Sequence, residues 1–210
     1  MKYLLLLFFY PLVVFSQSEI NDSLKVEKSN PIIFGEHFFG FSSSESFIGF
    51  SIGGNLNYQF NKSDLLTLRA TYFASFKINS ILNNSDSELS INSTEQIREY
   101  GLLYGKRYVF EGSSLSFSGG IAYFDRDYYT KSNRILTLTK QDYFGFPFEI
   151  NYKIFKSEKK RFGAIYGLVP IGRKKVAFGR SIGFKFIGNI SKNSYFGLGI
   201  SYGFGTHKVY

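Results

Sequence analysis

The residues of this chain that could do chemistry are mainly charged side chains on the polar face of runs in which polar and apolar residues alternate. Seven charged residues occupy that face: Arg69, Lys77, Glu99, Arg107, Glu149, Lys153 and Lys185. A buried charge is costly unless it is paired or hydrated. We therefore expect Glu99 and Glu149 to pair with Arg69, Arg107 and Lys153 in a structural network inside the fold. The alternative is a charged lumen that admits small solutes.

Catalytic side chains are scarce. The chain has two histidines, His37 and His207, and no cysteine, so disulfides, thiolate metal sites and cysteine nucleophiles are excluded. The histidines lie near the two ends of the patterned region, where closure of a barrel could bring them together, but neither lies in a nucleophile motif. The sequence predicts no enzyme, no catalytic residue, no metal and no cofactor.

Positive charge is concentrated in two short clusters in a chain whose net charge is +9. The clusters are Lys159, Lys160 and Arg161, and Arg173, Lys174 and Lys175. No aromatic residues alternate with these charges, as they would in a protein that binds single-stranded nucleic acid. The signal peptide described below also argues against a nucleic-acid partner, because an exported protein does not meet one. We expect these residues to contact anionic lipid headgroups or lipopolysaccharide phosphates. A solvated basic turn is the competing interpretation.

The first residues have the pattern of a secretory signal peptide. Lys2 precedes an apolar stretch from Leu4 to Val14, and the small residue Ser16 ends it. The stretch is shorter than the roughly 20 apolar residues that span a bilayer. We predict a signal peptide at residues 1–16, cleaved before Gln17, and a flexible polar lead-in at residues 17–31.

The rest of the chain, residues 32–210, alternates with a period of two, which is typical of β-strands and would scramble the two faces of a helix. The last run is the clearest, with Phe196, Leu198 and Ile200 opposed by Gly197 and Gly199. Nine runs can be identified: 32–41, 47–60, 66–78, 97–110, 115–128, 143–155, 162–172, 178–190 and 195–206. Single-chain bacterial barrels have an even number of strands. We therefore predict a closed antiparallel up-and-down β-barrel of 8 strands, with 10 as the fallback.

The connections between runs are of two kinds. Asn61 to Asp64, Glu111 to Ser114 and Ser191 to Ser194 have turn chemistry, whereas Asn79 to Thr94 and Thr130 to Gln141 are long and polar. Successive antiparallel hairpins would place all the short turns at one end and the long loops at the other.

Side-chain volume indicates which face of the barrel points outward. An interior of about eight strands is only just wide enough for side chains, so stacked Phe, Leu and Ile would overfill it. We expect Phe50, Leu68, Phe148 and Leu198 to face outward, and an apolar wall of this extent requires lipid as its solvent. Tyrosines near the run ends predict an interfacial girdle: Tyr58, Tyr108, Tyr128, Tyr143, Tyr152 and Tyr195. Arg98, Lys106 and Arg180, near strand ends on the outer face, can reach the headgroups.

These features resemble the small outer-membrane barrels of Gram-negative bacteria, the OmpA- and OmpX-like class. The resemblance extends to the terminal aromatic residue Tyr210, and the segments Tyr100 to Gly105 and Gly145 to Glu149 are similar to segments of secreted barrel proteins. It implies an outer-membrane location but no activity. We expect a structural or interaction role in which the long loops contact a protein partner, as loops on rigid scaffolds often do. Two alternatives stay open: a narrow passive pore, and a soluble periplasmic barrel that binds an apolar ligand as lipocalins do.

Overall fold

The computed structural model describes residues 31–44, 48–76, 93–132, 135–156, 160–164, 169–176 and 178–207. The predicted signal peptide, the lead-in as far as residue 30, Lys77, Lys159 and Tyr210 lie outside these residues, as does the predicted loop from Asn79 as far as residue 92. Within the described ranges, no helix is long and apolar enough to cross a membrane.

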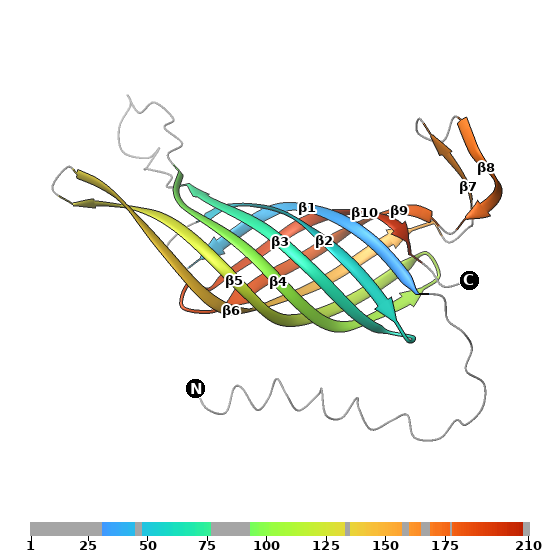
Figure 1. Ribbon diagram of the computed structural model, residues 1–210, viewed down its shortest axis with the longest axis horizontal. Helices are drawn as coiled ribbons and strands as arrows, with labels where there is room; N and C mark the ends of the chain where they lie inside the picture. Colours follow the sequence, from blue (N-terminus) through green and yellow to red (C-terminus); the bar gives the residue numbers. More distant parts are fainter. Residues whose placement is uncertain are drawn as a thin grey trace, which may run out of the picture.

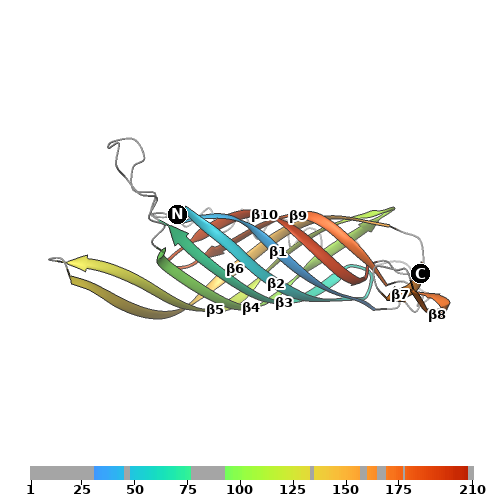
Figure 2. The same ribbon diagram turned by 90° about the horizontal axis from the view of Figure 1, so that it is seen from above.

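The molecule is a closed ring of eight antiparallel strands (Figures 1 and 2). The strands of the ring are β1 (Ile32–Ser44), β2 (Ile48–Phe60), β3 (Asp64–Phe76), β4 (Ser93–Phe110), β5 (Ser113–Ser132), β6 (Ile135–Phe155), β9 (Phe178–Ile190) and β10 (Tyr195–Thr206). The ring closes between β1 and β10, where the register runs from Phe34 opposite Gly205 to Ser44 opposite Tyr195. The predicted eight-stranded up-and-down barrel is therefore confirmed.

The odd count of runs is resolved by a small hairpin outside the ring. Strands β7 (Lys160–Ala164) and β8 (Val169–Val176) pair only with each other, and β6 pairs directly with β9. The weak run at Ile32–Phe41 is a true barrel strand, whereas the prediction of a barrel strand at Phe162–Gly172 is wrong. Pro170 lies in that run, and proline, which lacks an N–H donor, is disfavoured in a strand that must pair on both sides.

An even ring places the start of β1 and the end of β10 at the same end of the barrel (Figure 1, right). The turns after β2 and β4 lie at this end and are tight, since Asn61 has a φ of 51° and Gly112 a φ of 76°. The connection between β6 and β9, which carries the β7–β8 hairpin, also lies there. The short turn Ser191 to Ser194 lies at the opposite end, so the prediction that all short turns share one end is wrong. We call the end that holds the start of β1 and the end of β10 the termini end, and the other end the opposite end.

The second predicted loop, Thr130 to Gln141, is mostly strand. Strands β5 and β6 continue past their other neighbours and pair with each other as far as Ser132 opposite Ile135. The pairing of β4 with β5 stops at Tyr128, and that of β6 with β9 begins only at Phe146. The two strands thus project from the opposite end as a two-stranded ribbon (Figure 1, left). The alternation of Thr137, Leu138 and Thr139 is typical of such a strand.

Large apolar side chains cover the outer wall, as predicted. The exposed fractions are 40% for Phe50, 54% for Leu68 and 66% for Leu198. Phe148 is half-buried because its ring packs 5.8 Å from that of Phe186 and 6.0 Å from that of Phe196, which is itself 50% exposed. The outer wall is therefore apolar around the ring, and the buried side chains are those that point inward.

Candidate functional site

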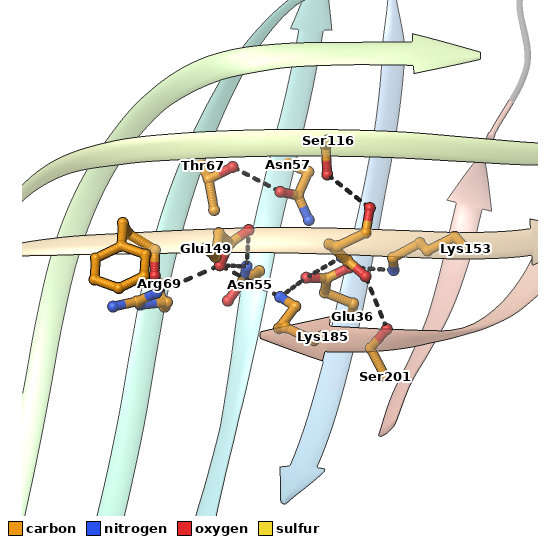
Figure 3. A network of polar contacts seen from close by, with 12 residues as sticks. Glu36, Asn55, Asn57, Thr67, Arg69, Ser116, Glu149, Lys153, Lys185 and Ser201 are labelled. Atoms are coloured by element: carbon orange, nitrogen blue, oxygen red, sulfur yellow. Dashed lines mark hydrogen bonds and ion pairs between the residues drawn. The ribbon is translucent and has the colours of Figure 1, made fainter. Parts of the chain in front are cut away.

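The barrel interior holds a continuous chain of polar contacts. Glu36 on β1 forms ion pairs with Lys153 on β6 and Lys185 on β9. The Nζ of Lys185 also lies 3.4 Å from Oε2 of Glu149, and Nη1 of Arg69 approaches the same oxygen at 3.5 Å. Figure 3 shows these side chains converging in the centre of the barrel. Glu36, Glu149, Arg69, Lys153 and Lys185 are each no more than 2% exposed.

The chain of contacts continues beyond Arg69. Arg69 is 2.5 Å from Glu99 on β4, measured from Nη2 to Oε1, and its Nε donates to the same oxygen at 2.6 Å. The hydroxyl of Tyr195 on β10 donates to the other carboxylate oxygen of Glu99. Three glutamates and three basic residues thus balance one another, so the charges of the network sum to zero.

Neutral side chains complete the network from further strands. The amide of Asn55 on β2 donates to both oxygens of Glu149, at 2.9 and 3.1 Å (Figure 3). Asn151 donates to Glu36 at 3.1 Å and accepts a hydrogen bond from Ser201 at 3.2 Å. Several of these pairs join strands that are not neighbours in the ring, such as β2 with β6 and β4 with β10. Such contacts can only cross the lumen, so side chains fill it.

The five predicted network residues differ in how they pair. Arg69 pairs with both Glu99 and Glu149 as expected, but Lys153 pairs with Glu36. Within the described part of the chain, the guanidinium of Arg107 donates to the side chain of Gln59 at 2.8 Å and to the backbone oxygen of His207 at 2.9 Å, and to no carboxylate. The expectation that Arg107 joins the glutamates is wrong, because its position near the termini end puts it beside aromatic rings instead.

Sequence reasoning did not place Glu36 or Tyr195 inside the barrel. Glu36 lies in a run with large apolar residues on both faces, so the sequence does not show which face points inward. In the structure Ile33, Phe39 and Phe41 lie on the outer face, and Glu36 lies on the inner one. Tyr195 was expected in the interfacial girdle and is instead 1% exposed inside the barrel. Tyr143 also points inward, packed against the buried cluster beside Phe124, whereas Tyr58, Tyr108 and Tyr152 lie on the outer wall as predicted.

Aromatic side chains close the lumen between the charge network and the opposite end of the barrel. The buried cluster comprises Phe38, Phe73, Ile97, Ala122, Phe124, Ile187 and Tyr195. The ring of Phe73 stacks on that of Tyr195 at 5.8 Å, and the ring of Phe124 stacks on that of Tyr143 at 5.1 Å. The interior is therefore not lined by small and polar residues alone. Aromatic side chains fill the lumen at the end of the barrel from which the β5–β6 ribbon projects.

A second closure lies near the termini end. The ring of His207, the residue after β10, lies 5.3 Å from that of Phe34 and 5.5 Å from that of Phe155. The guanidinium carbon of Arg107 lies 4.8 Å from the centre of the Phe34 ring, a cation–π distance. His37, by contrast, is exposed on the outer wall. Closure of the barrel thus leaves the two histidines on opposite faces of the wall, and they form no joint site.

The environment of His207 gives the protein a pH-dependent stability. Burial, assisted by the nearby positive charges of Lys153 and Arg107, lowers the pKa of His207 from 6.5 to about 4. Between those pH values the unfolded chain takes up a proton that the folded protein does not. Stability is therefore complete above pH 6.5 and falls as the pH drops toward 4. Because of this group, the free energy of unfolding falls by about 2 kcal/mol when the pH is lowered from 8 to 5.

This pH dependence can be checked by urea unfolding in lipid vesicles at pH 8 and pH 5. We expect His207→Gln to lose about 2 kcal/mol less than the unchanged protein over this interval. The control, His37→Gln on the outer wall, should keep the full loss. Equal losses in the protein and in both variants would contradict the role assigned to His207.

Five of the six predicted basic residues fall on the hairpin that is not in the ring. Lys160 and Arg161 lie in β7, and Arg173, Lys174 and Lys175 lie in β8, while Lys159 is outside the described residues. In the part of the chain that the structure describes, no group of three or more histidine, aspartate or glutamate side chains is arranged to hold a metal ion.

A ring of eight antiparallel up-and-down strands, apolar outside and filled inside, is the architecture of the small outer-membrane β-barrels. The N-terminal barrel domain of Pseudomonas aeruginosa OprF is similar to this chain, with 11% identity, a TM-score of 0.48, and coverage of 85% of this chain and 99% of that one. Neisserial surface protein A is similar with 10% identity, a TM-score of 0.48, and coverage of 86% and 99%. Ail of Yersinia pestis is similar with 9% identity, a TM-score of 0.45, and coverage of 83% and 97%. The sequence matches no protein-family model and no curated protein.

Proposed function

We propose that this protein is an integral outer-membrane barrel with a structural or interaction role and no catalytic activity. The observation that carries the proposal is the outer wall, where large apolar side chains such as Leu68, Leu102 and Ile121 lie next to one another on adjacent strands. Water is a poor solvent for a contiguous surface of this kind, and patches beyond a few hundred Å² drive association. The ring strands have 12 to 21 residues, and a tilted strand needs about 9 to 11 to cross a bilayer.

Cell fractionation and gel mobility test the membrane location. We expect the protein in the outer-membrane fraction, extracted only by detergent, and migrating differently before and after boiling. Recovery in the soluble periplasmic fraction would favour the lipocalin-like alternative. Nothing in the described barrel favours that alternative, since a lipocalin holds its ligand among inward-facing apolar residues around a cavity, and the charge network occupies this interior.

The filled lumen argues against the pore alternative. A solute would have to pass the aromatic cluster around Phe73 and Tyr195, the charge network, and the closure at Phe34 and His207. We expect no conductance steps when the purified protein is inserted in planar bilayers, with insertion verified by protection from protease. Reproducible single-channel steps from inserted protein would contradict a structural role and favour a narrow pore.

The β5–β6 ribbon is the surface that we assign to a protein partner. Among the described residues, its β6 strand from Ile135 to Gly145 pairs only with β5, which leaves the backbone groups of the other edge for another strand. Exposed apolar side chains lie on or beside the ribbon, namely Tyr129, Leu138 and Phe144, with Phe144 77% exposed. Loops and hairpins on rigid barrels commonly carry recognition.

Surface labelling tests whether this ribbon is available to a partner outside the cell. An epitope inserted at residues 133–134, the tip of the ribbon, should be labelled by antibody on intact cells. An epitope in the turn at residues 111–112, at the termini end, should be labelled only after the outer membrane is opened. The reverse pattern would overturn the role of the ribbon as an extracellular contact surface.

A further inference from the structure

The β7–β8 hairpin stands apart from the rest of the molecule in its charge. Its described strands carry five basic residues and no acidic one: Lys160 and Arg161 in β7, and Arg173, Lys174 and Lys175 in β8. The antiparallel register places Arg161 opposite Lys175 and Lys160 opposite Val176, so the two basic clusters of the sequence lie side by side at the base of one small sheet. A hairpin that carries several basic residues and no acidic one in its strands favours an anionic partner.

The excess of positive over negative charge in the connections lies at one end of the barrel. Residues 156–177, which join β6 to β9 at the termini end, hold seven basic residues and one acidic residue. The four connections at the opposite end, 45–47, 77–92, 133–134 and 191–194, hold three basic and three acidic residues. General solubility would not require such a difference between the ends, whereas recognition of a negative surface at the termini end would.

The apolar wall reaches the base of this hairpin. Ile154 at the end of β6 is 51% exposed, and Phe178 and Ile182 at the start of β9 are 44% and 57% exposed. These residues flank the hairpin in the chain, so in a bilayer the hairpin leaves the barrel where the acyl region ends. The hairpin lies to one side of the barrel mouth (Figure 1). The negative surface within reach at that position is the layer of lipid headgroups.

We infer that the β7–β8 hairpin binds anionic phospholipid headgroups of the leaflet at the termini end, which fixes the depth and rotation of the barrel in the membrane. Juxtamembrane lysine and arginine residues are attracted to anionic headgroups over about a Debye length, so the contact weakens as salt rises. The inference rests on the membrane placement proposed above. It selects the phospholipids of one leaflet over the lipopolysaccharide phosphates that the sequence left open.

The test uses a single fluorescent label, which is possible because the chain has no cysteine. Ala164→Cys, at the end of β7, is labelled, and the full-length protein is placed in nanodiscs of phosphatidylcholine alone or with 30% phosphatidylglycerol. Quenching by neutral acrylamide then reports the exposure of the hairpin to water. We expect the quenching constant to be at least twofold lower in the anionic discs, and 0.5 M NaCl to abolish the difference.

Two variants make the result specific. Changing Lys160, Arg161, Arg173, Lys174 and Lys175 together to glutamine should raise quenching in the anionic discs to the level in phosphatidylcholine. The matched control changes Lys131, Lys140 and Lys192 at the opposite end to glutamine and should keep the protection. Both variants are checked for folding by their gel mobility before boiling.

The inference is overturned by equal quenching in the two kinds of disc, by protection that persists in the five-residue variant, or by protection that requires lipopolysaccharide in place of phosphatidylglycerol. The variant Leu68→Trp, whose fluorescence is measured in discs of the same lipids, distinguishes failure of the headgroup contact from failure of the membrane placement. If brominated lipids quench that tryptophan while the hairpin label is insensitive to phosphatidylglycerol, the barrel is inserted and only the headgroup contact is wrong.

Discussion

Replacing Glu36 by glutamine is expected to lower the free energy of unfolding by about 3–5 kcal/mol. The carboxylate of Glu36 pairs with both Lys153 and Lys185 in a part of the barrel where all three side chains are at most 3% exposed. Its neutralisation leaves three basic residues facing two glutamates without water to screen them. Equilibrium unfolding in urea, with the protein in lipid vesicles and the folded fraction read by gel mobility, measures the loss.

A second substitution tests whether charge balance is the cause. Lys153→Met, added to Glu36→Gln, removes the excess charge, while Lys185 keeps its contact with Glu149 and the apolar side chain is placed beside Phe34. We expect the double variant to recover at least half of the lost stability. The control Lys106→Gln breaks a pair with Asp64 in which the lysine is 46% exposed, and should cost under about 1 kcal/mol. A double variant as unstable as the sum of its two single variants would contradict the account.

Replacing Leu68 by arginine is expected to cost about 2–4 kcal/mol in a bilayer. Leu68 lies in the middle of the outer wall, with Leu56 and Leu102 opposite it on the neighbouring strands. An arginine there would have to stay in the acyl region or bend toward the headgroups. The same residue at the surface of a water-soluble protein would change stability by only a few tenths of a kcal/mol.

The matched control for this substitution is Phe110→Arg. Phe110 is the last residue of β4, beside the tight turn at Gly112, and is 54% exposed, as Leu68 is. Because it lies at the edge of the wall, arginine should cost at most about 1 kcal/mol there. Equal costs at the two positions would mean that the wall has no depth-dependent environment, and that lipid does not surround it.

The barrel and its outer face could be predicted from the sequence because both depend on local alternation. Each residue of a strand points to the face opposite its neighbour, so Leu198 between two glycines is assigned to a face by the chain alone. The strand count could not be settled in this way. A run such as Phe162–Gly172 has the length of a barrel strand, and only the pairing of β6 with β9 shows that the ring bypasses it.

The interior partners could be predicted only in part, since they depend on strand tilt and stagger. Alternation indicates that Arg69, Glu99 and Arg107 point inward, but it carries no information on which of them lie at the same height in the lumen. Glu99 meets Arg69 through the register of β3 and β4, whereas Arg107 lies eight residues further along β4, near the termini end and among aromatic rings. Phe73 and Tyr195 are a different case, because alternation does place them on the inward face, with Arg69 and Gly197. Tyr195 was assigned to the interfacial girdle because it stands at the end of a run.

Quenching of a single tryptophan by brominated lipids tests the central claim most directly, since the chain has no tryptophan of its own. The variants are Leu68→Trp on the outer wall and, as the control in water, Lys140→Trp on the β5–β6 ribbon. We predict blue-shifted emission from the tryptophan at position 68, strong quenching by lipids brominated along the acyl chain and weak quenching by acrylamide, with the opposite behaviour at position 140. Quenching at position 68 by acrylamide and not by the brominated lipids would show that this wall faces water and would contradict the membrane barrel.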